Sequence, residues 1–169
     1  MTDKMEEILE TYPEFKNRLY IVGGPRREAL REAMSILLRL TDRCYVSTEW
    51  YCLKDSEEEI RNTIDEVAAA TGLGKSARDL FRTVKCGNVE FVKERIWGSY
   101  SRRFVRMTFI DSLESLHLRG QSYNREDVIK KLRGCPNPVI VVSDEILPIG
   151  PDTVQYNING TTFSLSVRG

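Results

Sequence analysis

The chain has 169 residues, of which 41% are hydrophobic and 30% charged, and its 25 basic and 25 acidic side chains leave no net charge. This composition is typical of one folded domain, or of one domain with a small appendage. No apolar run approaches the ~20 residues that cross a bilayer, and the charged start is unlike a signal peptide. We therefore expect an intracellular protein, nuclear or cytoplasmic, and exclude the membrane-spanning class.

Cysteine and histidine usage argues against metal and nucleophile chemistry. The four cysteines are Cys44, Cys52, Cys86 and Cys135, and the one histidine is His117. No two cysteines form a C-x-x-C pair, so we predict no metal site and reduced thiols with packing roles. A single histidine with no marked neighbours also disfavours a Ser-His or Cys-His catalytic arrangement.

The first elements are a helix, a strand and a longer helix. A capped helix is expected over residues 2–11 and a strand over 18–22, which Gly23-Gly24-Pro25 ends. Pro25 suits the first turn of the next helix, which runs to about Leu40 with apolar side chains at helical spacing. Residues 1–24 are expected to form an N-terminal helix and strand.

A helix, a turn, a basic helix and a β-ribbon are expected next. Ser56 and Glu59 form a capping box, and Gly72 is a C-cap. A second helix is expected over 76–83, and strands over 89–96 and 103–110 would make a wing. This order predicts a winged helix-turn-helix domain over residues 25–112.

The last third predicts a helix, a buried strand and a hairpin. A helix is expected over 124–133, an apolar strand over 138–142, and a hairpin over 154–167 around Asn159-Gly160. We assign residues 113–169 to a C-terminal αβ extension. The predicted fold class is thus α+β, a winged helix-turn-helix core with a C-terminal helix and β-hairpin extension.

A phosphate-binding loop is an alternative for one segment. Thr71–Ser76 resembles the TGxGK[ST] core of helicase-type P-loops, and Val139–Glu145 resembles an apolar strand that ends in an Asp-Glu pair. Lys75 would neutralise phosphates, while Ser76 and Asp144 would hold Mg²⁺. Because a P-loop follows a buried strand and this segment follows a capped helix, we favour the helix end. A P-loop NTPase fragment stays as an alternative.

Basic side chains gather in the predicted recognition helix and wing. The candidate nucleic-acid-binding residues are Lys75, Ser76, Arg78, Arg82, Lys85, Lys93, Arg95, Arg102 and Arg103. Positive side chains and helix N-terminal amides both suit phosphate contact, which favours duplex DNA as the ligand. Because the net charge is zero, a protein–protein interaction module that uses the same surface and the Asn159-Gly160 hairpin edge is the alternative. Either interpretation is compatible with an oligomer.

Residues 30–91 contain the segments ALREAMSILLRL, STEWYC, TIDEVAAATGLGKSARDL and VKCGNVEF in that order. In order and spacing they resemble the winged-helix domain of the topoisomerase VI A subunit and its relative, the meiotic double-strand-break transesterase. The resemblance implies that Tyr51 matches the tyrosine that attacks a DNA phosphodiester. Packing beside Trp50 is the alternative role for Tyr51.

The same resemblance implies that Mg²⁺ would be held by a separate Toprim domain. This chain would then contain no cofactor and would be inactive alone. We expect a DNA-binding component of a DNA-cleavage or chromosome-processing assembly, with DNA and a protein as partners.

Overall fold

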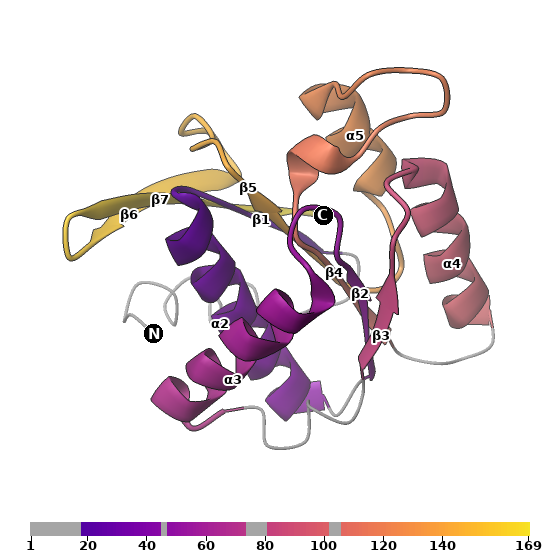
Figure 1. Ribbon diagram of the computed structural model, residues 1–169. Coiled ribbons are helices and arrows are strands. Elements are labelled where there is room, and N and C mark those ends of the chain that lie inside the picture. Colours follow the sequence, from indigo (N-terminus) through magenta and orange to yellow (C-terminus); the bar gives the residue numbers. More distant parts are fainter. Residues whose placement is uncertain (1–17, 45–46, 74–80, 102–105) are drawn as a thin grey trace.

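The computed structural model describes residues 18–44, 47–73, 81–101 and 106–169, and within these ranges the chain forms an α/β sandwich around one sheet (Figure 1). The strands are β1 (Leu19–Gly23), β2 (Ser47–Tyr51), β3 (Phe81–Val84), β4 (Arg106–Ile110), β5 (Val139–Ser143), β6 (Thr153–Ile158) and β7 (Thr161–Arg168). Their order across the sheet is β3-β2-β4-β5-β1-β7-β6. Neighbours from β3 to β1 are parallel, whereas β7 and β6 are antiparallel.

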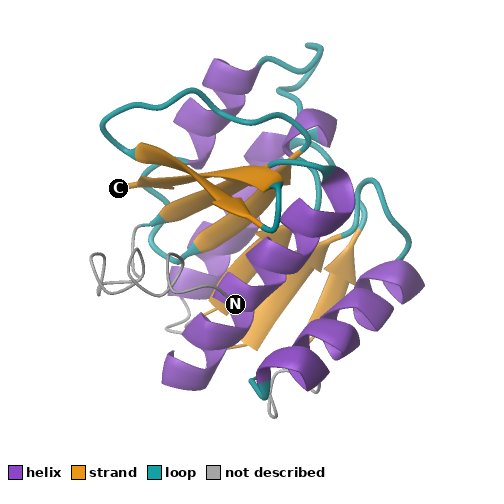
Figure 2. Cartoon of the chain, turned by 90° about the vertical axis from the view of Figure 1, so that its left-hand side faces the viewer, coloured by secondary structure: helices purple, strands orange, loops and turns teal. Residues whose placement is uncertain are grey.

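Helices cover both faces of the parallel part of the sheet (Figures 1 and 2). Helices α2 (Arg26–Cys44) and α3 (Glu57–Thr71) lie on one face, and α4 (Val89–Ser101) and α5 (Arg125–Leu132) lie on the other. A short 3-10 turn, η2 (Leu113–Ser115), follows β4. Parallel strands need such crossovers, because the chain must return to the same edge of the sheet before the next strand begins.

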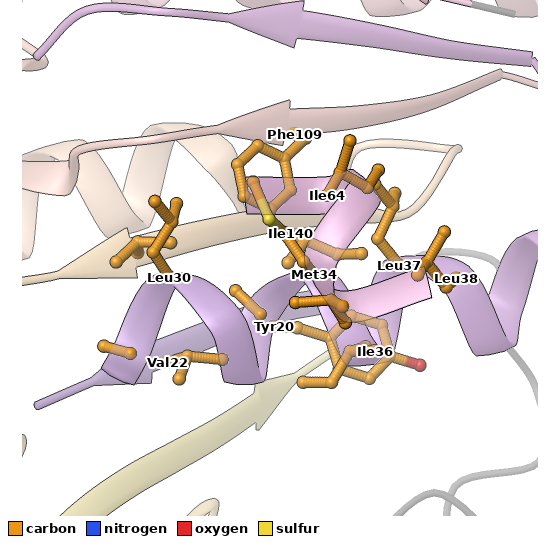
Figure 3. Close-up of a cluster of buried hydrophobic side chains, with 14 of the residues drawn as sticks. Tyr20, Val22, Leu30, Met34, Ile36, Leu37, Leu38, Ile64, Phe109 and Ile140 are labelled. Atoms are coloured by element: carbon orange, nitrogen blue, oxygen red, sulfur yellow. The ribbon is translucent and has the colours of Figure 1, made fainter. Parts of the chain in front are cut away.

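The two faces of the sheet carry two separate cores. In β1, Tyr20 and Val22 join the cluster beneath α2 and α3, while Leu19 and Ile21 join the cluster beneath α4 and α5. This follows from the alternation of side chains along a strand. Figure 3 shows the first cluster, in which Met34 of α2 packs near Ile140 of β5. All five residues of β1 and all five of β5 are buried, as expected of central parallel strands.

Several predicted elements are present in the structure. The Ser56 hydroxyl accepts a hydrogen bond from the Glu59 main-chain N–H at 3.2 Å, and Gly72 is the left-handed C-cap of α3 with φ 71°. The β6–β7 hairpin turns at Asn159 and Gly160, both with positive φ. The short C-terminal helix and the buried strand after it are also found, as α5 and β5. The predicted helix over residues 2–11 lies outside the described ranges.

The winged helix-turn-helix is wrong, and so is the α+β class. Residues 89–96, expected as the first wing strand, form the start of α4 instead. Its buried residues Val89, Val92 and Ile96 repeat at helical spacing, and the Asn88 side chain accepts a hydrogen bond from the Phe91 main-chain N–H at 3.1 Å. The alternation inferred from Val89 and Phe91 gave too much weight to Phe91, which is 37% exposed.

The predicted recognition helix also meets a strand. Residues 81–84, its C-terminal part, form β3, which pairs in parallel with β2. The sheet then runs through all three predicted segments, since β1 pairs with β5 and β7, and β4 pairs with both β2 and β5. The fold is therefore α/β, with a mostly parallel sheet.

Candidate functional site

Charged side chains meet at the carboxyl ends of four parallel strands. Arg26 follows β1, Lys54 and Asp55 follow β2, Asp111 follows β4 and Asp144 follows β5. Ligands of open α/β sheets bind in the crevice outside these strand ends, so this is where a functional site is expected.

Asp111 fastens the loop between β2 and α3. Its side chain is 1% exposed, and its carboxylate accepts hydrogen bonds from the main-chain N–H groups of Leu53 at 2.7 Å, Lys54 at 3.0 Å and Asp55 at 2.8 Å. Three such bonds satisfy a buried carboxylate without any ligand. Asp111 is therefore occupied by its own chain.

Arg26, the first residue of α2, joins three of these loops. Its Nη2 lies 2.6 Å from Asp55 Oδ2 and 3.5 Å from Asp111 Oδ2, and its Nη1 donates to the Asp111 main-chain carbonyl. The same guanidinium is 4.0 Å from Asp144 Oδ1. A planar guanidinium with five donors is suited to such bridging, and it links the ends of β1, β2, β4 and β5.

Lys54, Asp144 and Glu114 extend the network. Lys54 Nζ donates to Asp144 Oδ2, and Glu114 Oε1 accepts from the Ser143 hydroxyl at 3.2 Å and from the Asp144 main-chain N–H. Burial, with the nearby Asp144 charge, raises the pKa of Glu114 above its usual range. We call Arg26, Lys54, Asp55, Asp111, Glu114 and Asp144 the strand-end cluster. It contains four carboxyl groups and two cations.

The connection from β1 to α2 consists of Gly24 and Pro25 alone. Gly24 N–H donates to the Ser143 carbonyl at 3.3 Å, and the Glu145 carbonyl oxygen lies so close to Gly23 that a Cβ there would meet it at 2.2 Å. A P-loop places the residues GxxxxGK[ST] between such a strand and helix, so that successive amides surround the phosphates. Neither the length nor the residues of this connection fit a nucleotide's phosphates, and we assign no nucleotide or Mg²⁺ to it.

The segment expected as an alternative P-loop has a different setting. Gly72 ends α3, where its N–H donates to the Ala68 carbonyl at 2.9 Å, so the segment follows a helix and not a strand. Lys75 and Ser76 lie outside the described residues. The flanking residues Leu73 and Phe81 belong to the amino-terminal side of the sheet, because Phe81 begins β3 opposite Thr48 near the start of β2. That side is opposite to the strand-end cluster.

The candidate nucleic-acid-binding residues do not form one recognition helix and wing. Arg82 lies in β3, Lys85 is exposed just after it, and Lys93 and Arg95 lie in α4. Arg95 forms a two-pronged ion pair with Glu49, with Nε–Oε1 at 2.6 Å and Nη2–Oε2 at 2.7 Å, and Glu49 is 3% exposed. The remaining candidates, Lys75, Ser76, Arg78, Arg102 and Arg103, lie outside the described residues.

Tyr51 is buried at the end of β2. Its hydroxyl donates to Glu49 Oε1 at 2.9 Å, and burial together with the Glu49 charge raises the pKa of the phenol. A nucleophilic tyrosine needs access to the phosphate and a favoured phenolate, and this environment opposes both. Packing in the core is the role that these contacts give Tyr51.

Two of the cysteines have the packing role predicted for them. Cys52 and Cys135 are buried free thiols, and burial raises the pKa of each to about 11. In the ranges that the structure describes, no three side chains of His, Cys, Asp or Glu are arranged to hold a metal ion. The same ranges hold no helix with the length and hydrophobicity of a membrane span.

Sequence reasoning found Asp144 but missed Arg26, Glu49, Asp111 and Glu114. Asp111 carried a recognisable signal, since the apolar run of β4 ends at Ile110 directly before it, in the same way that β5 ends before Asp144. Arg26 carried none, because its partners Asp55 and Asp111 are distant in sequence.

Comparisons with known proteins support the fold and not the predicted family. No protein-family model matches the chain, and no curated protein matches it in sequence. Among solved structures, it resembles an isolated ATPase domain with a TM-score of 0.57 and 13% identity over 83% of this chain. It also resembles a DnaB-like replicative helicase, whose structure includes its interactions with primase, with a TM-score of 0.53 and 12% identity over 82% of this chain.

The chain spans 62% of the first of these structures and 42% of the second. At this identity the similarity establishes the fold alone, which is that of a RecA-like ATPase domain. The predicted resemblance to the topoisomerase VI winged helix is therefore wrong, and of the expected functions the P-loop NTPase alternative had the better fold. Its proposed phosphate loop, however, follows α3 and not a strand.

Proposed function

We propose that this chain is a non-hydrolysing relative of RecA-like ATPase domains that acts by binding a protein partner, as an accessory component of a nucleic-acid-processing assembly. The observation that carries the proposal is the Gly24-Pro25 connection between β1 and α2. In ATPases of this fold class the corresponding strand-to-helix connection is the phosphate cradle. Here Arg26 enters the helix at once and is held by Asp55 and Asp111.

The charge of the strand-end cluster supports the same conclusion. Four carboxyl groups face two cations, and both cations already have carboxylate partners: Arg26 with Asp55, and Lys54 with Asp144. A triphosphate brought to this place would meet net negative charge in a partly buried setting, where repulsion is poorly screened. A nucleotide site would need the opposite balance.

A protein partner is favoured over direct DNA contact by charge. The chain has no net charge, and Arg95, one of the candidate DNA-binding cations, is already paired with buried Glu49. The assembly is suggested by the similar structures, one of which is a replicative helicase described with its interactions with primase.

The test is nucleotide binding by the full chain, measured by calorimetry with ATP and Mg²⁺. We expect no saturable binding. Lys75→Ala serves to detect the alternative site, and Lys85→Ala, which removes an exposed lysine after β3, is its matched control. Saturable binding that Lys75→Ala abolishes and Lys85→Ala retains would overturn the proposal.

A second measurement separates the two kinds of partner. Duplex DNA is titrated at several salt concentrations, because the slope of affinity against salt counts phosphate contacts. We expect no salt-dependent affinity. A steep slope that is reduced in Lys85→Ala or Lys93→Ala would make DNA the direct partner instead.

A further inference from the structure

Strand β6 forms one edge of the sheet, and the direction of its main-chain groups follows from the bonds of its neighbours. The Asp152 carbonyl accepts a hydrogen bond from Val167 N–H of β7 at 2.9 Å, so its groups point inward. Thr153 points outward, since its N–H and C=O bond to Gly150 at 3.3 and 3.2 Å. Because main-chain directions alternate along a strand, Val154, Tyr156 and Ile158 point toward β7, and Gln155 and Asn157 point to the open edge.

These outward groups are available. Gln155 and Asn157 are both exposed, and within the described part of the chain no hydrogen bond takes up their edge-facing N–H and C=O groups. The Gln155 side chain is held back by its own bond to the Leu147 carbonyl at 2.9 Å, so it does not cover the edge. Two residues of β6 therefore present a free pairing edge.

The edge also lacks the usual protection. Natural proteins block exposed edges with lysine, proline or inward-pointing charge. The segment Thr153–Ile158, TVQYNI, contains none of these, although 30% of the chain is charged. The opposite edge strand, β3, is shorter and carries Arg82. The two edges thus differ in their capacity to pair.

We propose that β6 pairs antiparallel with β6 of a second copy of this chain, about a two-fold axis that passes through Tyr156. In this register Gln155 lies opposite Asn157 of the second copy, and the two outward-pointing residues exchange both main-chain hydrogen bonds. The symmetric pair repeats this on the other side of the axis. The sheet becomes continuous across both copies.

Side-chain chemistry selects the same register. On the face covered by α2, Val154, which is 39% exposed, lies opposite the partly buried Ile158 of the second copy. On the other face two amide side chains lie opposite each other. Such pairs of like chemistry each contribute about 0.2–1 kcal/mol to strand pairing.

The neighbouring antiparallel register is weaker. A two-fold axis at Gln155 would place Asn157 opposite Thr153, whose edge-facing groups are already bonded to Gly150. Only the pair on the axis could then form. The register centred on Tyr156 is the one that uses the free groups of both Gln155 and Asn157.

The test is the oligomeric state of the full chain, measured by sedimentation equilibrium over a range of concentrations. We expect a monomer–dimer equilibrium that Val154→Lys weakens about tenfold or more, because a lysine then faces Ile158 in each half of the interface. Gln155→Pro is expected to weaken it similarly. It removes an N–H that points away from β7 and so leaves the hairpin ladder intact.

Ile149→Lys is the matched control. Ile149 is 73% exposed and lies in the adjoining loop outside β6, so its substitution must leave association unchanged. Circular dichroism and thermal unfolding establish that each variant is folded. A chain that stays monomeric throughout, or an association that Val154→Lys and Gln155→Pro leave intact, would overturn the proposal.

Amide hydrogen exchange measures the pairing residue by residue. The amides of Gln155 and Asn157 should gain protection as concentration rises. Those of Val154, Tyr156 and Ile158 should be protected at every concentration, since they bond to β7. Association without this alternating gain would place the interface elsewhere and contradict the proposed register.

Discussion

The Arg26 guanidinium donates to the main-chain carbonyl of Asp111, and its Nη2 lies 3.5 Å from the carboxylate of the same residue. The two residues are 85 positions apart in sequence. Their contact joins the start of α2 to the end of β4 at the place where a RecA-like ATPase would bind phosphate. An internal arginine thus supplies the positive charge that faces the acidic strand ends.

Arg26→Ala is expected to lower the free energy of unfolding by about 2–4 kcal/mol. It removes the cation next to Asp111, which is 1% exposed, while leaving that carboxylate buried. The measurement is urea unfolding. Arg27→Ala is the control, since Arg27 is 77% exposed and its ion pair with Glu66 is 3.8 Å long, and it should change stability by no more than about 0.5 kcal/mol. Equal effects of the two substitutions would contradict a structural role for the cluster.

Arg95→Ala is expected to destabilise the fold by about 3–5 kcal/mol, because Glu49 would stay buried without its partner. Arg95→Lys should restore only part of this loss, since an ammonium cannot make the two-pronged contact. Unfolding in urea measures both. Lys93→Ala, in the same helix, tests whether any truncation of α4 has the same effect, and a loss as large as that of Arg95→Ala would refute the explanation.

Glu32→Gln is expected to stabilise the protein at neutral pH. Burial raises the pKa of Glu32, so the fold favours the protonated carboxyl and loses stability as pH rises through the folded-state pKa. A glutamine stays neutral and can still accept the bond from the Tyr156 hydroxyl, which is 3.0 Å long. The gain should vanish toward about pH 4, near the ordinary carboxyl pKa.

The readout for Glu32→Gln is the melting temperature against pH. Glu28→Gln, on the exposed part of the first turn of α2, is the control and should not reproduce the profile. A gain that is the same at acidic and neutral pH would mean that titration of Glu32 is not its cause.

Gly160→Ala is expected to cost about 1–2 kcal/mol, because the residue has φ 85° in the β6–β7 turn and an L-side chain is strained there. Gly98→Ala in α4 is the matched opposite case. A Cβ there would meet nothing within 4 Å, so it should stabilise the helix by about 0.5–1 kcal/mol. Thermal unfolding compares the two, and the same sign for both would disprove the backbone argument.

Part of the fold could be predicted because its causes are local. The Ser56 cap, the Gly72 helix end and the Asn159-Gly160 turn each depend on contacts within a few residues. The run Val139–Ser143 identified a strand buried on both faces. The segment 89–96 failed because its apolar residues satisfy two periodicities at once, and only packing against the sheet shows that Val89, Val92 and Ile96 are the buried set.

The candidate site could be predicted only in part. The position of Asp144 after an apolar strand could be seen in the sequence, and the same signature stands at Asp111. What each acid contacts could not be seen, since Lys54 reaches Asp144 across 90 positions. The basic residues of 75–106 looked like one surface, but Arg95 is turned toward Glu49 on β2.

The caps, the turns and the buried strands are specified in the amino-acid sequence, because hydrogen bonds and side-chain periodicity within a few residues decide them. Other features arise only in the folded molecule: β1 lies between β5 and β7, Arg26 meets Asp55 and Asp111, and β6 is left as a free edge. These features depend on which strands become neighbours. Strand order is set by the burial of two whole faces of a sheet, a property of the entire chain that no single segment records.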